Sequence, residues 1–597
     1  MPNAADDPDQ DEWNAAASMA DSFRQRTAGG CMKILGINFS NDSAAALVVD
    51  GQVMGAVQEE RLSRVKHDSG FPARAVRWCL QDAGLTMADI DRVAFFWNPG
   101  KHAEPGRSST AAFPRDHLEY LYAVPVQLMR HFDGVGVERV DQTFVLENGQ
   151  ALTTHYLTHH HCHAAGAFFR SNFERAAILT IDGYGERMST HFGRGHGTTL
   201  EHLHTVEFPH SVGSLYAAFT QYLGFRANNG EGKVMGLASY GQPTYYDAIR
   251  KMVTLSPDGF ELDLSYFSYY LRRRRRYGEK LVKLLGPERA PESELTQRHM
   301  DIAASLQAVT EELVLHLAAM ARDKTGEDNL VMSGGVVLNC VANGRVARES
   351  GFDRCYFMPA SSDAGTSLGA ALYVAHVLGE DPRAVHPETD YLGPQYDDAE
   401  IEAVLQVSGC PYQRPPDIAE AAADLLASGH IVGWMQGRAE FGPRALGSRS
   451  ILADPRAPEM KDTLNARVKF REYFRPFAPV VLEERAAEFF TGGRKAPYML
   501  EVFPTHPDHL EALEAITHVD GGARVQTVTS EANGRYYDVV RAFGERTGVP
   551  VLVNTSFNIR GEPIVTTVQD ALKCFSTTDM DALALGSFLL TKPGVGA

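Results

Sequence analysis

The chain has 597 residues, of which 44% are hydrophobic and 22% charged, and its formal net charge is −18. This length predicts two to four domains, because a single core rarely grows beyond about 300 residues. The negative charge argues against nucleic acid or an anionic membrane surface as the main partner.

The cysteine content and the absence of long apolar runs favour a cytoplasmic protein. There are seven scattered cysteines and no Cys-x-x-Cys pair, which fits a reducing compartment and excludes a disulfide scaffold. No uninterrupted apolar run approaches about 18 residues, so no membrane span is expected. Residues 1–31 are polar and lack the apolar core of a signal peptide, so we expect a disordered extension there.

The first part of the chain predicts an α/β domain with an internal repeat. Apolar runs and an Asp-Gly turn predict strands at 33–38, 44–49, 53–57 and 90–96, and helical spacing predicts a helix at 71–83. A similar series of strands follows at 178–181, 189–193 and 203–206. Two such halves suggest a duplicated domain with a nucleotide in the cleft between them.

The middle of the chain contains a segment without clear periodicity. Residues 245–300 are expected to be irregular, and the run Arg272–Arg276 favours a solvated basic face over a phosphate-binding site, because no aromatic residue interleaves with it. Later patterns predict a helix at 301–325, a strand at 330–333 and a helix at 336–347.

A second domain is expected after a polar, proline-bearing stretch near 380–415. The predicted elements beyond it are helices at 419–427 and 568–575 and strands at 431–435 and 551–554. We therefore divide the chain into domains at 32–385 and 386–597.

The run His159–Ala164 carries the first candidate site. His159 and His163 are four residues apart, so on a helix they project from one face, as a shared metal ion requires. Asp182 follows an apolar strand and leads into a glycine turn of the kind that approaches phosphate, and Asp363 is a further natural ligand. The alternative is a pair of buried, hydrogen-bonded histidines. We expect Cys162 to face away and serve packing.

The second domain combines arginines with turn-forming residues. Three arginines lie within Gln436–Ser450, and three more cations lie within Lys469–Pro479. Guanidinium groups clamp phosphate or carboxylate, and Gly-Pro and Pro-Phe-Ala-Pro elements fix the backbone that carries them. The pattern indicates an anion site, whereas the alternative is a set of exposed surface arginines.

These motifs, taken in order, resemble one family. Asp-Gly-Tyr-Gly-Glu (182–186), Gly-Glu-Gly-Lys-Val-Met-Gly (230–236), Ser-Gly-Gly-Val-Val-Leu-Asn-Cys (333–340), Gly-Arg-x-Glu-Phe-Gly-Pro-Arg-Ala-Leu-Gly-x-Arg-Ser-Ile (437–451) and Asn-Thr-Ser-Phe-Asn (554–558) look like those of the NodU/CmcH-type O-carbamoyltransferases. That family acts in nodulation-factor and antibiotic biosynthesis, and the resemblance runs from about residue 33 to 590.

The resemblance implies an N-terminal actin-like ATPase (ASKHA) domain and a C-terminal YrdC-like α/β domain. It also implies that carbamoyl phosphate and ATP give carbamoyl-adenylate, whose carbamoyl group passes to a hydroxyl of a small natural product such as an antibiotic or sugar-containing metabolite. Mg²⁺ would accompany ATP, and an Fe(II)-like divalent ion would occupy the site of His159, His163, Asp182 and Asp363.

By the same resemblance, two further sets of residues bind substrates. Those in the C-terminal domain, for carbamoyl phosphate and ATP, are Arg438, Arg444, Arg449, Lys469, Arg475, Arg524, Asn554, Ser556 and Asn558. Those in the N-terminal domain, for the nucleotide or adenylate, are Gly183, Gly185, Glu186, Gly213, Ser214, Gly232, Lys233, Gly334, Gly335 and Asn339.

The chain departs from the family at its expected general base. Many members carry a histidine where this chain has Asn41, and an amide takes no proton at neutral pH. Asp42 or His67, beside Lys66, substitutes for it, or the metal activates the acceptor, or the chain is a catalytically impaired nucleotide-binding homologue. The other alternative is a small-molecule kinase of the actin-like fold, which would assign no function to the arginine-rich domain. A homodimer is plausible by similarity.

Overall fold

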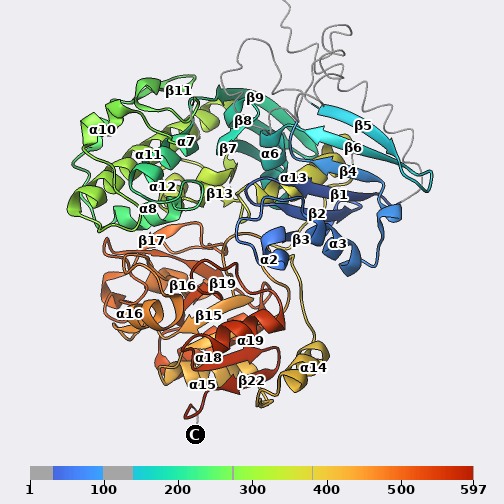
Figure 1. Cartoon of the computed structure of the whole chain (residues 1–597), viewed down its shortest axis with the longest axis vertical. Coiled ribbons are helices and arrows are strands. Elements are labelled where there is room, and N and C mark those ends of the chain that lie inside the picture. Colours follow the sequence, from blue (N-terminus) through green and yellow to red (C-terminus); the bar gives the residue numbers. More distant parts are fainter. Residues whose placement is uncertain (1–30, 99–138, 272–273, 380, 596–597) are drawn as a thin grey trace, which may run out of the picture.

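The computed structural model describes residues 31–98, 139–271, 274–379 and 381–595 (Figure 1). The expected extension over 1–31 lies outside these ranges except for Cys31, and so do Arg272 and Arg273 of the arginine run. The described chain forms an upper α/β part with two sheets and a lower part with a third sheet (Figure 1).

The first sheet has the strand order β3-β2-β1-β4-β6-β5. β1 (Lys33–Asn38), β2 (Ala44–Val49) and β3 (Gln52–Gln58) form an antiparallel meander, and β4 (Arg92–Phe95) joins β1 in parallel. β6 (Ala151–Leu157) continues in parallel, and β5 (Arg139–Val145) forms the edge. The connecting helices are α2 (Glu59–Ser63), α3 (Ala73–Asp82) and η1 (Met87–Asp89).

The second sheet repeats this plan in the order β13-β12-β7-β8-β9. β7 (Arg175–Gly185), β8 (Met188–His196) and β9 (Thr199–Glu207) are the meander, and β12 (Asn329–Ser333) and β13 (Arg354–Phe357) are the parallel strands. The predicted repeat is therefore confirmed. Asp182 lies within β7, where the pairing with β8 shifts register, rather than in a turn after the strand.

Two helices cross between these sheets. α6 (His159–Arg170) follows the first set of strands but packs on β7 and β12, whereas α13 (Ala364–Leu372) follows the second set but packs on β1 and β2. Their backbones touch where Gly369 faces Cys162, and a Cβ atom on Gly369 would overlap the Cys162 carbonyl. Glycine is needed at this crossing because any side chain would force the helices apart.

A helical insertion covers one face of the second sheet between β9 and β12. Its elements are α7 (Val212–Tyr222), α8 (Glu231–Ala238), α9 (Tyr246–Arg250), β10 (Val253–Ser256), β11 (Gly259–Leu262), η2 (Leu264–Tyr266), α10 (Glu279–Leu285) and α11 (Gln297–Thr325). The expectation of an irregular segment at 245–300 was wrong: the segment holds short helices and strands, of which α9 and β11 pack on the long helix α11, and elements this short leave little periodicity in the sequence.

Two helix predictions need correction at their boundaries. The helix expected at 336–347 is divided into η3 (Gly335–Leu338) and α12 (Cys340–Glu349), because Asn339 turns the chain and caps α12 through its side chain. α3 begins at Ala73 rather than at 71, after Pro72. Among the described helices, α11 alone is long and apolar enough to cross a membrane, with 61% of that window buried, and buried core helices meet the same criterion.

The lower part holds a mixed sheet in the order β19-β16-β20-β15-β14-β21-β22. Its strands are β14 (Val432–Met435), β15 (Arg449–Ala453), β16 (Ala478–Leu482), β19 (Gln526–Val528), β20 (Val551–Ser556), β21 (Ala582–Leu585) and β22 (Phe588–Thr591). The small hairpin beside it consists of β17 (Val502–Pro504) and β18 (Gly522–Arg524).

Helices cover both faces of the lower sheet. They are α14 (Asp398–Ser408), α15 (Ile418–Ala427), α16 (Met460–Leu464), η5 (Asn465–Lys469), η6 (Glu483–Arg485), α17 (Ala486–Phe489), η7 (Pro507–His509), α18 (Gly534–Thr547) and α19 (Val568–Ser576). The described upper strands end at Phe357 and the strands of the large lower sheet begin at Val432, while the domain boundary near 385 stays a prediction.

Candidate functional site

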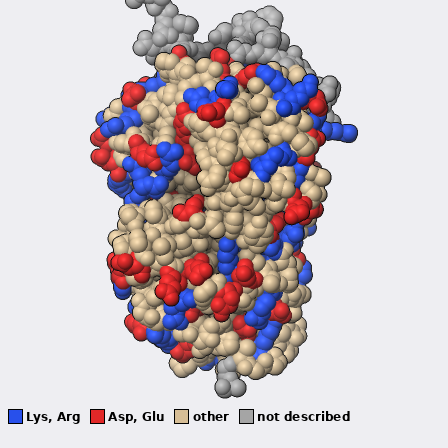
Figure 2. All heavy atoms as spheres, turned by 90° about the vertical axis from the view of Figure 1, so that its left-hand side faces the viewer, with Lys and Arg blue, Asp and Glu red and all other residues tan. Residues whose placement is uncertain are grey.

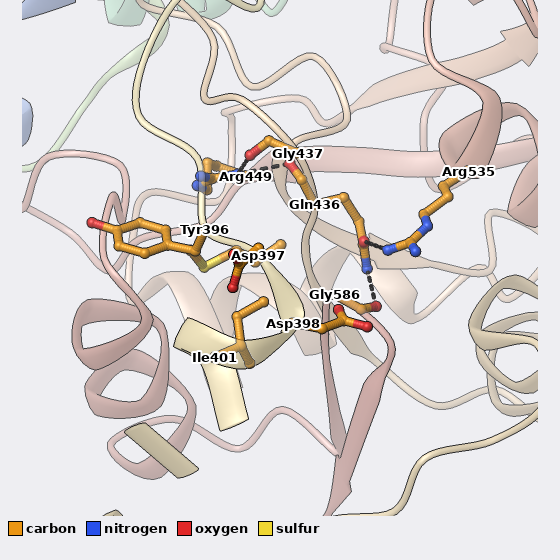
Figure 3. Close-up of a pocket in the computed structure, with 10 residues that line it drawn as sticks. Tyr396, Asp397, Asp398, Ile401, Gln436, Gly437, Arg449, Arg535 and Gly586 are labelled. Atoms are coloured by element: carbon orange, nitrogen blue, oxygen red, sulfur yellow. Dashed lines mark hydrogen bonds between the residues drawn. The ribbon is translucent and has the colours of Figure 1, made fainter. Parts of the chain in front are cut away.

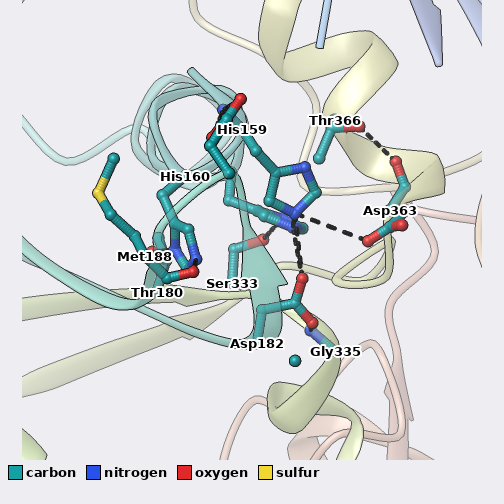
Figure 4. Close-up of polar contacts among 12 residues, drawn as sticks. His159, His160, Thr180, Asp182, Met188, Ser333, Gly335, Asp363 and Thr366 are labelled. Atoms are coloured by element: carbon teal, nitrogen blue, oxygen red, sulfur yellow. Dashed lines mark hydrogen bonds and ion pairs between the residues drawn. The ribbon is translucent and has the colours of Figure 1, made fainter. Parts of the chain in front are cut away.

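Four side chains from different parts of the upper half meet at the first turn of α6 (Figure 4). Nε2 of His159 lies 3.0 Å from Oδ2 of Asp182, 3.1 Å from Nε2 of His163 and 3.7 Å from Oδ1 of Asp363. One ligand atom from each residue lies within 4.8 Å of the others. The structure therefore brings together all four residues that the sequence assigned to a metal.

The surroundings hold two of these ligands in place. Oγ of Ser333 lies 3.0 Å from Nδ1 of His163, so the hydroxyl can accept that proton and leave Nε2 with a lone pair. The backbone N–H of Gly335 donates to Oδ1 of Asp182 at 3.0 Å. The Nε2 atoms of the two histidines face each other beside the two carboxylates. This set of two nitrogen and two oxygen atoms fits a divalent transition-metal ion.

The electrostatics of the cluster also favour a cation. Burial raises the pKa of Asp363, and the nearby Asp182 charge raises it further. Burial opposes the charge of Asp182, but hydrogen bonds with His159 and His163 hold its pKa well below the usual range. Burial likewise opposes the charge of His159, yet the Asp182 hydrogen bond and the surrounding carboxylates raise its pKa. Burial lowers the pKa of His163.

His160, which lies between the two ligands in sequence, has a structural role. Its Nδ1 lies 2.6 Å from Oγ1 of Thr180 and its Nε2 lies 3.1 Å from the carbonyl of Met188. The nearby Cys162 is buried among apolar residues, as the packing interpretation predicted.

The residues predicted to bind the nucleotide fall into four groups. A Cβ atom on Gly213 would lie 2.8 Å from the Asp182 backbone, and Ser214 donates to the carbonyl of Gly183 at 3.4 Å. The residues that surround Asp182 are Gly183, Gly213, Ser214, Gly334 and Gly335.

The remaining members have other surroundings. Gly185 lies against the His159 ring, and the Glu186 carboxylate accepts the backbone N–H of His159 at 3.1 Å. Gly232 and Lys233 lie on α8, where Lys233 pairs with Glu472 of the lower part at 2.8 Å. Asn339 caps α12 and exchanges hydrogen bonds with Gln307.

Asp42 and His67 form a pair beside the metal ligands. Nδ1 of His67 lies 2.8 Å from Oδ1 of Asp42, and both side chains are partly exposed. Nδ2 of Asn38 donates to the carbonyls of Asp42 and Asp363, which places the pair next to the cluster. Asn41 is exposed in the turn after β1. The sequence offered Asp42 and His67 as alternatives, and the structure joins them.

A second site lies where the lower part meets the upper part. Arg444 donates to the carbonyl of Leu338 at 3.4 Å, and Lys233 pairs with Glu472 across the same junction. Burial and the neighbouring charges of Arg524 and Arg475 lower the pKa of Arg444 to about 9. Burial also lowers the pKa values of Arg524 and Arg475.

This group of arginines is short of negative charge. Among the described residues, the carboxylate paired with Arg475 is Glu472, at 3.8 Å, and it also pairs with Lys233. No described acceptor pairs with the Arg524 side chain. Partly buried cations that lie close together without matching carboxylates repel one another, so the arrangement fits a polyanionic ligand.

Lys469, Ser556 and Asn558 form one network at the end of β20. Nζ of Lys469 lies 2.6 Å from the Ser556 carbonyl and 2.8 Å from Oδ1 of Asn558. Burial and neighbouring arginines hold the pKa of Lys469 well below its ordinary range. Asn554 donates to the carbonyl of Ala445 and to Gln526, and its buried Oδ1 has no partner among the described residues.

Two predicted anion-binding residues lie elsewhere. The buried Arg449 guanidinium donates to the carbonyls of Gln436, Gly437, Ser448 and Pro394. It lines a separate pocket of about 290 Å³, shown in Figure 3, with Tyr396, Asp397, Asp398, Ile401, Met435, Gln436, Gly437, Arg535 and Gly586. Arg438 pairs with Asp82 of α3 at 2.8 Å. Both arginines hold backbone segments together in this structure.

Two residues beside these sites, Arg471 and Cys340, were given no role from the sequence, and the position of a third, Lys66, was not predicted. The exposed Lys66 ammonium lies close enough to Asp42 and to Arg475 for both charges to act on it. Lys66 was assigned to catalysis, but its place between the two sites was not foreseen. Arg471 lies over the Phe477 ring at 4.4 Å, and Cys340 begins α12 close to Arg444 and Arg524. The only sequence signal was their adjacency to glycine and proline motifs.

Comparison with known proteins identifies the family. Family models described as Carbamoyltransferase N-terminus and Carbamoyltransferase C-terminus match residues 33–372 and 423–592. An uncharacterised protein of Synechocystis sp. is 43% identical over 94% of this chain and 96% of its own length. Nodulation protein NolNO of Sinorhizobium fredii is 40% identical over 95% of this chain and 82% of its own length.

A third relative, nodulation protein NolO of Bradyrhizobium diazoefficiens, is 43% identical over 73% of this chain and 79% of its own length. The resemblance stated from the ordered motifs is therefore confirmed. With both family models matched in order across most of its length, this chain belongs to the carbamoyltransferase family and is a carbamoyltransferase.

Proposed function

We propose that the chain transfers a carbamoyl group in two steps at two sites. The arginine site at the junction forms carbamoyl-adenylate from carbamoyl phosphate and ATP, and the His159 site passes the carbamoyl group to a hydroxyl. The observation that carries this proposal is the group of partly buried arginines Arg444, Arg475 and Arg524, whose charges act on Arg444 and which have too few described carboxylates to balance them.

The first step needs several anionic groups in one place. Water attacks carbamoyl phosphate and releases phosphate, and an oxygen of the resulting carbamate attacks the α-phosphorus of ATP and releases pyrophosphate. Guanidinium groups fixed around these oxygens offset the charge as the bonds change. Arg444, Arg475 and Arg524 are placed for this role, with Arg471 and Lys469 adjacent to them. Mg²⁺ would accompany ATP.

The second step uses the upper site. His159, His163, Asp182 and Asp363 would hold a divalent, Fe(II)-like ion, which when bound supplies Lewis-acid polarisation of a carbonyl. His67, with its Nδ1 held by Asp42, can take the acceptor proton at Nε2 as the hydroxyl oxygen bonds to the carbamoyl carbon. AMP leaves with the oxygen that joined it to the carbamoyl group. Asn41 is left to orient the acceptor.

The proposal extends to the fold and to the acceptor. The two repeated sheets with crossing helices fit an actin-like ATPase domain over 32–385, and we assign the lower part, 386–597, as YrdC-like. The acceptor is a small hydroxylated natural product. Basic and acidic side chains are interspersed over the face in Figure 2, without one dominant basic patch that would favour nucleic acid.

The test separates the two steps. The purified chain is given carbamoyl phosphate and ATP, without acceptor, and phosphate and pyrophosphate release are measured. Both products should require both substrates. Arg444→Ala should reduce pyrophosphate release at least about 100-fold, because it removes a fixed donor to developing charge. His163→Ala should retain adenylate formation and lose transfer to hydroxylated metabolites in a panel.

The opposite outcomes have clear meanings. Carbamoyl-adenylate accumulating at the wild-type rate in Arg444→Ala would refute the assignment of the arginine site. Formation of ADP from ATP and an acceptor alone would instead show a kinase.

A further inference from the structure

Three histidines gather on the side of α6 away from the proposed catalytic metal. His161 lies on α6, His191 on β8 and His202 on β9, and one ligand atom from each lies within 4.8 Å of the others. Successive helical residues point about 100° apart, so His161 projects from a different side of α6 than His159 and His163. This group has no part in the proposed carbamoyl transfer.

The local sheet geometry explains why these rings can meet. β8 and β9 change register between Phe192 and Gly193, and Gly193 pairs with His202. A Cβ atom on Gly193 would lie 2.9 Å from Cε1 of His191 and 2.6 Å from the carbonyl of Glu201. The glycine thus leaves the space that the His191 ring uses beside His202.

The ring geometry places the three imidazoles around one point. The centroids of His191 and His202 are 5.1 Å apart with an interplanar angle of 22°, and those of His161 and His191 are 5.3 Å apart. Tyr373 lies parallel to His161, with centroids 6.3 Å apart, and begins the π-helix η4 (Tyr373–Leu378). Single π-helical turns of this kind are frequent at functional sites.

We propose that His161, His191 and His202 form a second metal site, for a zinc-class divalent ion. Three neutral imidazoles without thiolate or carboxylate suit Zn²⁺, Co²⁺, Ni²⁺ or Cu²⁺ and disfavour Mg²⁺ and Ca²⁺, which prefer oxygen ligands. His191 is buried, His161 is partly buried and His202 is exposed, so the site opens to solvent on the β9 side. A water molecule completes a tetrahedral set from that side.

The position of this site indicates what a bound ion does. It joins α6, which carries His159 and His163, to the outer strands β8 and β9 of the second sheet. Occupancy therefore fixes the helix that presents two ligands of the first site, without contributing a group to the reaction. The two sites differ in chemistry, since one has two carboxylates and the other has none.

Metal counting on the full chain tests the proposal. Protein freed of metal by a chelator is dialysed against Zn²⁺, and bound zinc is measured per chain by mass spectrometry of the metal. Wild type should bind one equivalent more than His202→Ala, whose exposed side chain can be removed without opening the core. His196→Ala is the matched control, because His196 is an exposed histidine at the end of the neighbouring strand β8, outside the cluster.

Repeating the zinc measurement in the His163→Ala variant separates the second site from the first, because His163 belongs only to the first. His163→Ala should still bind one equivalent of Zn²⁺, and adding His202→Ala should abolish it. With Co²⁺ as the probe, the visible absorption of tetrahedral cobalt should remain in His163→Ala and disappear in the double variant. Equal zinc content in wild type and His202→Ala, or loss of the same equivalent in His196→Ala, overturns the proposal whatever the carbamoyl-transfer activity.

Discussion

In the proposed transfer, the Asp42–His67 pair supplies the base that Asn41, in the expected position, cannot supply. His67 adopts a left-handed backbone conformation with φ of 54°, and its N–H donates to Glu60 at 2.9 Å. Both features fix the loop that turns the imidazole toward Asp42. A carboxylate on Nδ1 selects the tautomer whose Nε2 is free to accept a proton, which is the arrangement that general-base catalysis requires.

We therefore expect His67→Asn to lower carbamoyl transfer about 10²–10⁴-fold, the usual contribution of a positioned base. Release of phosphate and pyrophosphate without acceptor should stay near the wild-type rate, because the arginine site is intact. The two rates are measured on the same preparation. Asn41→Ala is the comparison variant and should affect the KM for the acceptor more than kcat. Equal transfer rates in His67→Asn and wild type would exclude His67 as the base.

A Ser333 variant tests whether the hydrogen bond to His163 strengthens metal binding at the proposed site. Its hydroxyl fixes His163 from the side away from the cluster, at 3.0 Å, so Ser333→Ala should weaken divalent-ion affinity about 10–100-fold. Titration calorimetry with Fe²⁺ or Co²⁺ measures this directly. Thr180→Val is the control, since Thr180 bonds the non-ligand His160 and its loss should leave the affinity unchanged. Unchanged affinity in Ser333→Ala would contradict the assigned role.

At the scale of elements, the linker between the upper part and α14 carries a buried carboxyl. Asp390 is 1% exposed, its backbone carbonyl accepts the N–H of Phe441, and its side chain lies 3.8 Å from Arg170 of α6. Burial raises the pKa of Asp390 to about 7 despite that arginine. The linker is thus tied into the core near the helix that holds the histidines.

This carboxyl predicts a pH dependence of stability. Because the folded pKa of Asp390 lies above its unfolded value, ionising this carboxyl destabilises the folded state. The contribution of Asp390 to the free energy of unfolding is therefore fully present below the ordinary carboxyl range and is lost as the pH rises toward about 7. Asp390→Asn should raise the midpoint of thermal unfolding, and the gain should increase from pH 5 to pH 8. The exposed Asp353→Asn should show no such trend. A gain that is equal at both pH values would refute the interpretation.

The helices and strands whose bounds the sequence predicted well have clear sequence signals. β1, β2 and α11 have strong apolar periodicity or clear turns at their ends, and each was located to within a few residues. The elements of the 245–300 segment were missed because each is too short to show periodicity, and because α9 and β11 are held by packing on the distant helix α11. Two features of the sites could not be predicted from residue spacing, because they depend on contacts between separate segments. One is the contact of His67 with Asp42, and the other is the set of hydrogen bonds from Arg449 to backbone carbonyls.

At the scale of the whole molecule, the two sites depend on how the upper and lower parts are held together. Arg64 donates to the carbonyls of Ile564 at 2.6 Å and Pro563 at 3.0 Å and lies 3.3 Å from Asp570. Arg61 donates to the carbonyl of Gly442 at 2.6 Å. These contacts lie in the same loop region as Lys66 and His67, so they align the loop with the arginine site.

Arg64→Ala should therefore uncouple the two steps. Pyrophosphate release should stay within about two-fold of wild type, whereas the ratio of carbamoylated product to pyrophosphate should fall, because the loop would no longer be fixed by its charge-assisted hydrogen bonds. Product and pyrophosphate are measured together, with an acceptor found in the metabolite panel. Arg74→Ala, which changes an exposed arginine of α3, is the control. A constant ratio in Arg64→Ala would show that this anchor is dispensable.

The crossing of α6 and α13 also determines when the upper half can mature during synthesis. β1 and β2 emerge from the ribosome early, yet the helix that covers them comes last, and Asn38 bonds to Asp363, 325 positions later. Contacts of such sequence separation form late, since loop-closure entropy delays them. A nascent chain that ends before Asp363 has an uncovered sheet and three of the four proposed metal ligands. If the four residues hold a metal as proposed, we expect the complete site to form only after α13 has left the ribosome.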